Sequence, residues 1–96
     1  MVVTEPKRLA LVLHRDDNVA VALTNLRRGQ EVSVSVDGGV LTVVLVDDIP
    51  FGHKFAIRDI PTGGFVVKYG EVIGVATRPI KVGEHVHVHN VKSTRI

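Results

Sequence analysis

Apolar residues recur at every second position in parts of this chain, which is the period of a β-strand with one buried face. In Glu31–Val36, valine alternates with a polar residue throughout. The triplet Asp37-Gly38-Gly39 follows, and residues 40–46 then form a second apolar run. Because glycine after aspartate favours the tight reversal of a hairpin, the pattern predicts two antiparallel strands over residues 31–36 and 40–46.

Short apolar runs bounded by glycine, proline or charged residues occupy the rest of the chain. The first, residues 9–13, predicts a strand that ends at His14. Further strands are predicted over residues 54–58, 65–68, 71–77 and 85–91. We therefore expect residues 1–96 to form one mostly β domain, with a polar lead-in over residues 1–7 and a tail or linker start over residues 92–96.

One short helix is expected between the first strand and the hairpin. Residues 15–18 have the composition of a turn, and Asp16 or Asp17 can cap a helix by accepting hydrogen bonds from its first N–H groups. Residues 19–26 would form its body. Two valines in that body lower its helix propensity, because branched side chains lose rotamer freedom in a helix, so a buried strand is the alternative.

A spacing motif recurs three times along the chain. An aliphatic residue is followed after three positions by glycine and after three more by valine. The copies are Leu26, Gly29 and Val32; Ile60, Gly63 and Val66; and Ile80, Gly83 and Val86. The spacing predicts a buried anchor, a turn in which glycine adopts a positive φ, and a new strand.

Composition and charge narrow the classes of function. The net charge is +2 and no run of lysine and arginine exceeds two residues, so we expect no nucleic-acid partner, which would select a basic stripe with interleaved aromatic residues. The absence of cysteine excludes disulfides, thiolate chemistry and sulfur-ligated zinc. No apolar run reaches the roughly 18 residues of a membrane helix, and the first residues lack the pattern of a signal peptide. The expected location is the cytoplasm, without a membrane partner.

Histidine alternates with valine near the end of the chain, at His85, His87 and His89. In a strand, the three imidazoles would share one face and the intervening Val86 and Val88 the buried face. Imidazole is a common metal ligand, and two of them two residues apart can converge on one ion. We therefore predict His87 and His89 as metal ligands, the alternative being a strand with polar residues on its solvent side.

Several ordered motifs together resemble a known family. They are residues 14–20 (HRDDNVA), 52–60 (GHKFAIRDI), 68–74 (KYGEVIG) and 87–93 (HVHNVKS). Over about residues 11–92 they are similar to the SAF-type domain that forms the N-terminal part, or the separate small subunit, of altronate and galactarate dehydratases. The small subunit of (2R)-sulfolactate sulfo-lyase is a close relative. The resemblance implies a β-clip fold of short bent strands, shared with antifreeze-like domains.

The same resemblance implies a role beside a much larger catalytic subunit or domain. Such complexes remove water from a small sugar acid and are associated with a divalent metal, iron(II) or manganese, that would be bound only in the full enzyme. One alternative is a sulfo-lyase small subunit that helps eliminate sulfite from sulfolactate. Another is a non-catalytic module that binds a sugar or another polar ligand. Exposed strand edges in so small a domain also favour homo-oligomers.

Further candidate site residues lie in the same motifs. His53 and Lys54 follow a turn that presents both side chains and are the candidate catalytic pair, with Lys54 as a carboxylate ligand or a base. Alternatively, one of the two lies on the exposed face of a strand. His14, Asn18 and Asn90 are the candidate substrate-binding residues. The alternative for the first two is a turn that only bonds its own backbone.

Overall fold

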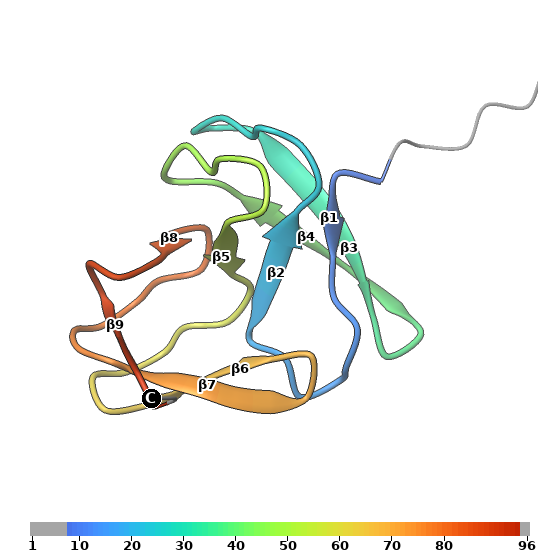
Figure 1. The fold of residues 1–96 in the computed structure, drawn as a ribbon. Coiled ribbons are helices and arrows are strands. Elements are labelled where there is room, and N and C mark those ends of the chain that lie inside the picture. The colour runs from blue at the N-terminus through green and yellow to red at the C-terminus, as the bar shows by residue number, and fades with distance from the viewer. Residues whose placement is uncertain (1–7, 95–96) are drawn as a thin grey trace, which may run out of the picture.

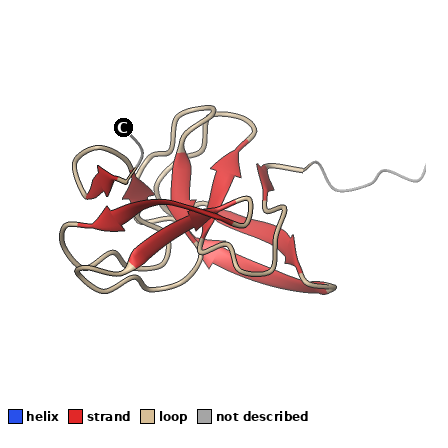
Figure 2. Ribbon diagram, turned by 60° about the horizontal axis from the view of Figure 1, so that its bottom comes forward, coloured by secondary structure: helices blue, strands red, loops and turns tan. Residues whose placement is uncertain are grey.

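The computed structural model describes residues 8–94, which form nine short strands and no helix (Figures 1 and 2). The mostly β prediction is therefore confirmed. The strands are β1 (Ala10–Leu11), β2 (Val19–Ala22), β3 (Glu31–Val36), β4 (Gly39–Val44), β5 (Lys54–Ala56), β6 (Phe65–Lys68), β7 (Glu71–Ala76), β8 (His85–Val86) and β9 (Val91–Ser93).

The strands form three antiparallel sheets. Four of them pair in the order β1-β2-β5-β8, β3 and β4 form a hairpin, and three pair in the order β6-β7-β9. In Figure 1 the four-stranded sheet occupies the middle of the molecule, with the hairpin beside β1 and with β6 and β7 below. The four-stranded sheet thus separates the hairpin from the three-stranded sheet.

Two hydrophobic clusters lie on opposite faces of the four-stranded sheet. The first joins that sheet to the β3–β4 hairpin and includes Phe55, and the second joins it to β6 and β7 and includes the adjacent Ala56. Successive side chains of a strand point to opposite faces, so β5 contributes to both clusters. Both β5 and its neighbour β2 are therefore largely buried.

The predicted hairpin is confirmed. β3 has the predicted bounds, and β4 begins at Gly39 and ends at Val44, two residues before the predicted end. The valines of β3 that face the core are buried, as the alternation requires.

The spacing motif is also confirmed, and the structure contains a fourth copy at Ile49, Gly52 and Phe55. All four anchor residues are buried, the four final residues are fully buried, and the four glycines have φ between 81° and 91°. The fourth copy escaped the sequence pattern because phenylalanine replaces valine at its last position.

The four copies associate in two pairs. Leu26 and Ile49 exchange two backbone hydrogen bonds of 2.8 and 2.9 Å, and Ile60 and Ile80 exchange two of 2.8 Å. Each glycine N–H then donates to the carbonyl four residues before its partner anchor, as Gly83 does to Ala56. The chain therefore folds as two similar pairs of strand–turn–strand units. In each pair, the backbone groups of one unit form hydrogen bonds with those of the other.

The predicted helix after His14 is wrong. Residues 15–18 form a turn as expected, but the chain then enters β2, which pairs with β1 on one side and β5 on the other. Val19 and Ala20 are almost fully buried. A central strand buried on both faces reads as a continuous apolar run, so its sequence cannot be told from a short buried helix by period alone.

The predicted strand over residues 85–91 is also wrong. β8 ends at Val86, the N–H groups of Asn90 and Val91 both donate to the carbonyl of His87, and β9 begins only at Val91. Val88, expected on the buried face, is 83% exposed. The alternation of histidine and valine therefore runs through a turn and does not continue a strand.

The predicted lead-in over residues 1–7 lies outside the described residues, as do the last two residues of the predicted tail, and β9 includes residues 92 and 93. Within residues 8–94 there is no helix of the length and hydrophobicity needed to cross a membrane.

Candidate functional site

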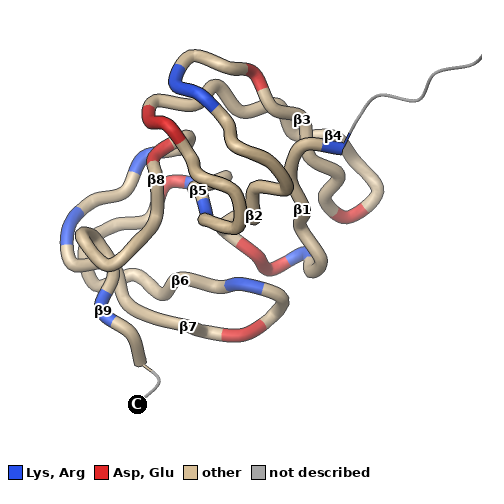
Figure 3. The backbone as a smooth tube through the Cα atoms, turned by 45° about the horizontal axis from the view of Figure 1, so that its top comes forward, with Lys and Arg blue, Asp and Glu red and all other residues tan. Residues whose placement is uncertain are grey.

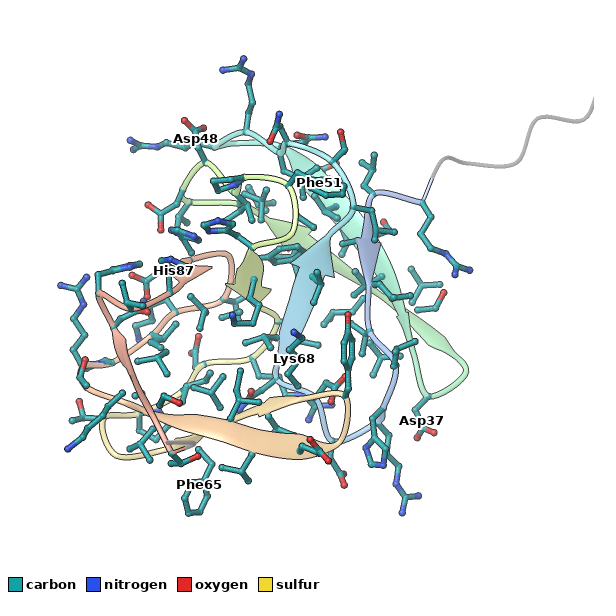
Figure 4. The ribbon with its side chains drawn as sticks, viewed as in Figure 1. Asp37, Asp48, Phe51, Phe65, Lys68 and His87 are labelled. Atoms are coloured by element: carbon teal, nitrogen blue, oxygen red, sulfur yellow. The ribbon has the colours of Figure 1, made fainter. Side chains whose placement is uncertain are left out.

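Four imidazoles gather where the turn before β5 meets β8 and the turn after it. The ring of His53 stacks on His87 with centroids 4.5 Å apart and on His85 with centroids 5.1 Å apart. The ring centroids of His85 and His87 are 5.3 Å apart, and the centroid of the tilted His89 ring lies 5.3 Å from that of His85. Figure 4 labels His87 at this end of the molecule. The structure thus brings together residues from two distant segments of the chain.

The pairing of β5 with β8 produces this arrangement. Lys54 lies opposite Val86 and Phe55 opposite His85. Extending the antiparallel register by one residue places His53 opposite His87, just beyond the last paired residues. Directly opposed side chains share a face, so the two rings stack without a continuous strand over residues 85–91.

Two side chains hold the histidine segment by its backbone. The amide of Asn90, which is 1% exposed, accepts a hydrogen bond of 3.0 Å from the N–H of His87 and donates one of 2.9 Å to the carbonyl of His85. The carboxylate of Asp47 accepts a hydrogen bond of 2.9 Å from the N–H of His85. Asn90, predicted to bind substrate, therefore has its amide oxygen and nitrogen bonded to the turn that carries the histidines.

The environment favours neutral imidazoles. Partial burial lowers the pKa of His85 and of His87, and the positive charge that His53 would carry lowers the pKa of each further. Lys54 adds to the depression of the pKa of His87, while Asp47 partly opposes that of His85. Neutral imidazole has a free nitrogen lone pair, so both rings are prepared to bind a cation near pH 7.

Three of the four histidines could together hold a metal ion. One ligand nitrogen each from His53, His85 and His87 lie within 4.8 Å of one another. Nδ1 of His53 and Nε2 of His85 are 2.9 Å apart and share a hydrogen bond. Two nitrogens at that separation subtend about 90° at an ion with bonds of about 2.0–2.1 Å. Three imidazoles leave further coordination positions for water or substrate, as catalytic metal sites do.

Lys54 follows His53 and lies in the middle of the four-stranded sheet, on the face of Val86 and opposite to the face of Phe55 and His85. Its neighbours across β2 and β8 are Val21 and Val86, and it is half-buried. Burial lowers the pKa of Lys54, and the nearby charge of Lys68 lowers it further. Figure 4 shows the Lys68 side chain reaching from β6 toward β2, and Figure 3 shows basic segments on both β5 and β6.

The other predicted site residues lie at the first turn. The amide of Asn18 accepts a hydrogen bond from the N–H of Val67 and donates one to the carbonyl of Phe65, both 2.8 Å long, so it joins this turn to β6. The exposed His14 packs against Gly70 and borders an open hollow of about 390 Å³ beside the β3–β4 turn. The structure therefore places Asn18 against β6 and His14 against Gly70, and neither belongs to the imidazole cluster.

Sequence reasoning missed three participants. They are His85, which was placed on one strand face with His87 and His89 but was not among the two predicted ligands, and Lys68 and Asp47, for which no site role was predicted. The place of His85 in the site follows from the register of β5 against β8, which the sequence alone does not show. His89, predicted as a ligand with His87, touches the ring of His85 and lies outside the group of three converging nitrogens.

Comparisons with known proteins add a family context. The sequence profile of the altronate/galactarate dehydratase SAF domain matches residues 8–94. The chain is 49% identical to altronate dehydratase of Escherichia coli and 41% identical to that of Bacillus subtilis, in each case over 84% of this chain and 16% of the relative. It is 42% identical to (2R)-sulfolactate sulfo-lyase subunit alpha of Chromohalobacter salexigens, over 83% of this chain and 88% of that subunit. The chain thus spans a small part of the dehydratases and most of the separate subunit.

Proposed function

This chain belongs to the SAF-domain family of altronate and galactarate dehydratases, and we propose that it is the small subunit or N-terminal domain of a sugar-acid dehydratase. In this proposal it adopts the β-clip fold, acts in the cytoplasm and contributes residues to a site shared with a large catalytic partner. The substrate is a small sugar acid, and the reaction is the loss of water.

The observation that carries the proposal is the convergence of three imidazoles beside a half-buried lysine. Elimination next to a carboxylate requires a positive group that stabilises charge on the carboxylate as the α-proton leaves. Neutral imidazoles next to a cationic side chain meet that requirement when they hold a cation. A purely structural domain has no need of such a cluster at its surface.

We assign the cation to His53, His85 and His87, with iron(II) or manganese as the expected ions. Imidazole ligands suit divalent iron, and open positions suit substrate oxygen atoms. When bound, the ion supplies Lewis acidity at the substrate carboxylate or hydroxyl. His53, predicted as catalytic, is therefore assigned to metal binding together with His85 and His87. His89, predicted as a ligand, is assigned a place beside these three residues.

The chain's own residues prepare this site. A hydrogen bond brings Nδ1 of His53 and Nε2 of His85 together, and an ion bound by both nitrogens would replace it. The amide of Asn90 fixes the backbone on either side of Val86. Lys54 adds a positive charge next to His87, suited to holding a substrate carboxylate or, in its neutral form, to taking a proton. Burial favours that neutral form by lowering the pKa of the lysine.

A partner is needed to complete the site. Two large apolar side chains flank the histidines in the sequence and are exposed: Phe51 by 66% and Val88 by 83%. Exposed apolar residues beside polar ones are typical of protein interfaces. In the dehydratases that this chain resembles, the matched region is 16% of the whole, which leaves a large remainder to cover such a surface.

A second candidate function is the sulfo-lyase small subunit. It is favoured by the 42% identity to a separate alpha subunit, 88% of which the match covers. Sulfite leaves without a proton donor, so this reaction places more weight on anion binding and less on acid catalysis.

The test is to recover the chain with its bound partner from its own organism and to assay the complex on altronate, galactarate and sulfolactate, with and without iron(II). Loss of water from a sugar acid, by the complex and by neither protein alone, is the expected result. Release of sulfite from sulfolactate alone would move the chain to the second candidate. A complex with no lyase activity would refute both and leave a binding module.

Metal binding is tested separately, by titrating iron(II) or manganese into the complex and into the free chain and measuring bound metal directly. His87→Ala is expected to lower the affinity at least tenfold, and His14→Ala, which changes a histidine outside the cluster, is the matched control. Equal metal affinity of the parent chain, His87→Ala and His14→Ala would refute the assignment of the ligands.

A further inference from the structure

In two of the four copies of the spacing motif, the side chain that follows the glycine closes the turn. In the first copy, the N–H of Arg27, directly after the anchor, donates a hydrogen bond of 3.0 Å to the side chain of Gln30. In the last copy, the N–H of Lys81 donates in the same way to the carboxylate of Glu84. These two side chains therefore serve their own turns, as the Glu or Gln of a capping box serves a helix start.

The other two copies have proline at the donor position. Pro50 follows the anchor of the second copy and Pro61 that of the third, and proline has no N–H to donate. The residue after the glycine is His53 in the second copy and Gly64 in the third. An acceptor side chain is thus used where the turn has a donor, and a turn that begins with proline does not require one.

The turn before β5 satisfies its backbone without the imidazole of His53. Three N–H groups follow Pro50, and each has an acceptor: the side chain of Asn25, the carbonyl of Ala22 and the carbonyl of Pro50, at 2.8, 2.9 and 3.0 Å in chain order. Nδ1 of His53 lies instead 2.9 Å from Nε2 of His85. Because every N–H of this turn is accounted for, the imidazole is available to the histidine cluster.

We propose that Pro50 is a positioning residue of the candidate metal site, which keeps the imidazole of His53 available to a cation by removing the N–H that it would otherwise accept. The proposal rests on the proposed function, in which His53 is one of three ligands of the cation. An imidazole of this chain does accept a nearby backbone N–H, since that of Asp16 donates to Nδ1 of His14 over 3.1 Å. A ring nitrogen that accepts such a bond has no lone pair left for a metal ion.

Pro50→Ala restores the missing donor, and Pro61→Ala is its matched control. Both substitutions remove the same ring and add the same N–H, but the turn of Pro61 ends in Gly64 and contains no imidazole. Both variants should fold, because Arg27 and Lys81 occupy the same position in the other two turns. If either variant fails to fold, the glutamine variant at that position replaces it.

Metal affinity is measured by titrating iron(II) anaerobically into the chain, alone and with its partner, and quantifying the bound metal. Pro50→Ala is expected to lower the affinity about fivefold, which corresponds to the net strength of one hydrogen bond, and Pro61→Ala to leave it unchanged. Parental affinity in Pro50→Ala would overturn the proposal. Equal losses in both variants would overturn it as well, because the lost rigidity of proline would then explain the effect.

NMR of the metal-free chain gives a readout that a purely structural role of Pro50 would not change. In Pro50→Ala, the restored N–H at position 50 should exchange slowly with solvent, and the ¹⁵N shift of a His53 ring nitrogen should change. In Pro61→Ala, the restored N–H at position 61 should exchange rapidly and the imidazole shifts should stay as in the parent. Rapid exchange at both positions, with unchanged imidazole shifts, would overturn the proposal.

The two measurements separate this proposal from the proposed function. If the parent chain binds no iron(II), alone or with its partner, the assignment of the ligands is refuted. The NMR comparison then still decides whether Pro50 controls the hydrogen bonding of the His53 imidazole.

Discussion

At the scale of single residues, the chemistry of the candidate site depends on which imidazoles are neutral. His85 and His87 lie among other histidines, Lys54 adds a positive charge near His87, and partial burial is the largest cause of the lowered pKa of each. Each proton added to the cluster therefore opposes the next. The cluster therefore differs from an ordinary polar surface, on which the pKa of histidine is near 6.5.

This environment gives a pH prediction. A histidine whose pKa is lower in the folded than in the unfolded chain binds protons more readily when unfolded, so its contribution to stability is complete above about pH 6.5 and is lost as the pH falls below that value. We expect imidazole NMR titrations of His85 and His87 with midpoints below 6.5, and lower resistance to urea at pH 5 than at pH 7. Midpoints at or above 6.5 would contradict this account.

Asn90 gives a second prediction at this scale. Asn90→Ala removes two hydrogen bonds and leaves the N–H of His87 and the carbonyl of His85 unpaired, which should cost about 2–3 kcal/mol of the free energy of unfolding. Metal affinity should fall as well, because the turn that carries His87 is no longer fixed. Urea unfolding and metal titration measure the two effects.

The control for Asn90 is Ser33→Ala, which removes an exposed hydrogen bond with Thr42 in the hairpin. It should change stability by less than about 1 kcal/mol and leave metal affinity unaltered. If Asn90→Ala lowers stability but not metal affinity, its proposed role in positioning the histidines is wrong.

Residue patterns predicted part of this site. The alternation of histidines marked the correct segment, and the segment after Gly52 marked His53 and Lys54. The grouping of His53 with His85 and His87 could not be predicted, because it depends on the register of β5 against β8 over 32 residues of separation. Asn90 was predicted to bind substrate, whereas its buried amide is hydrogen-bonded to the backbone of His85 and His87.

At the scale of elements, the turn motif carries most of the fold. Each copy buries an anchor, places glycine at positive φ and starts a strand, and the copies pair through backbone hydrogen bonds. Local spacing predicted three of the copies because their requirements are local. The helix prediction was wrong because β2 is buried on both faces. The last strand was predicted too long because the chain turns after Val86, where the side chain of Asn90 accepts a hydrogen bond from the N–H of His87.

Two glycines of the motif allow a matched test. Gly83 has φ of 91°, and a Cβ there would run into the carbonyl oxygen of Val44, whereas Gly63 has φ of 81° with nothing near the Cβ position. Gly63→Ala should cost about 1–2 kcal/mol, the penalty of the left-handed region alone. Gly83→Ala should cost clearly more, because the backbones of two sheets must also separate.

Urea unfolding of both variants measures the difference. Equal losses would show that the close approach of Gly83 to β4 adds nothing beyond the backbone conformation. A larger loss for Gly83→Ala confirms that this turn also sets the distance between the hairpin and the segment leading into β8.

At the scale of the whole molecule, the candidate site lies at a surface that the proposed partner would cover. Val88→Asp places a charge between His87 and His89 without removing any buried group, since Val88 is 83% exposed. We expect it to weaken association with the partner at least tenfold and to leave the fold unchanged. Co-purification and thermal unfolding measure these two properties.

Val40→Asp is the matched control, because Val40 is 74% exposed but lies on the β3–β4 hairpin, away from the histidines. It should leave association unaltered. If the two variants weaken association equally, the partner covers the hairpin as well. If neither weakens it, the partner does not bind at the histidine surface.

The central claim is that the imidazole cluster of this chain forms part of a lyase site completed by a larger partner. The most direct measurement is the rate of water loss from altronate and galactarate by the purified complex, comparing the parent chain with His87→Ala and with Ser33→Ala. The account predicts activity in the parent, a loss of at least a hundredfold in His87→Ala with the complex still assembled, and parental activity in Ser33→Ala. An assembled His87→Ala complex with undiminished activity would contradict it.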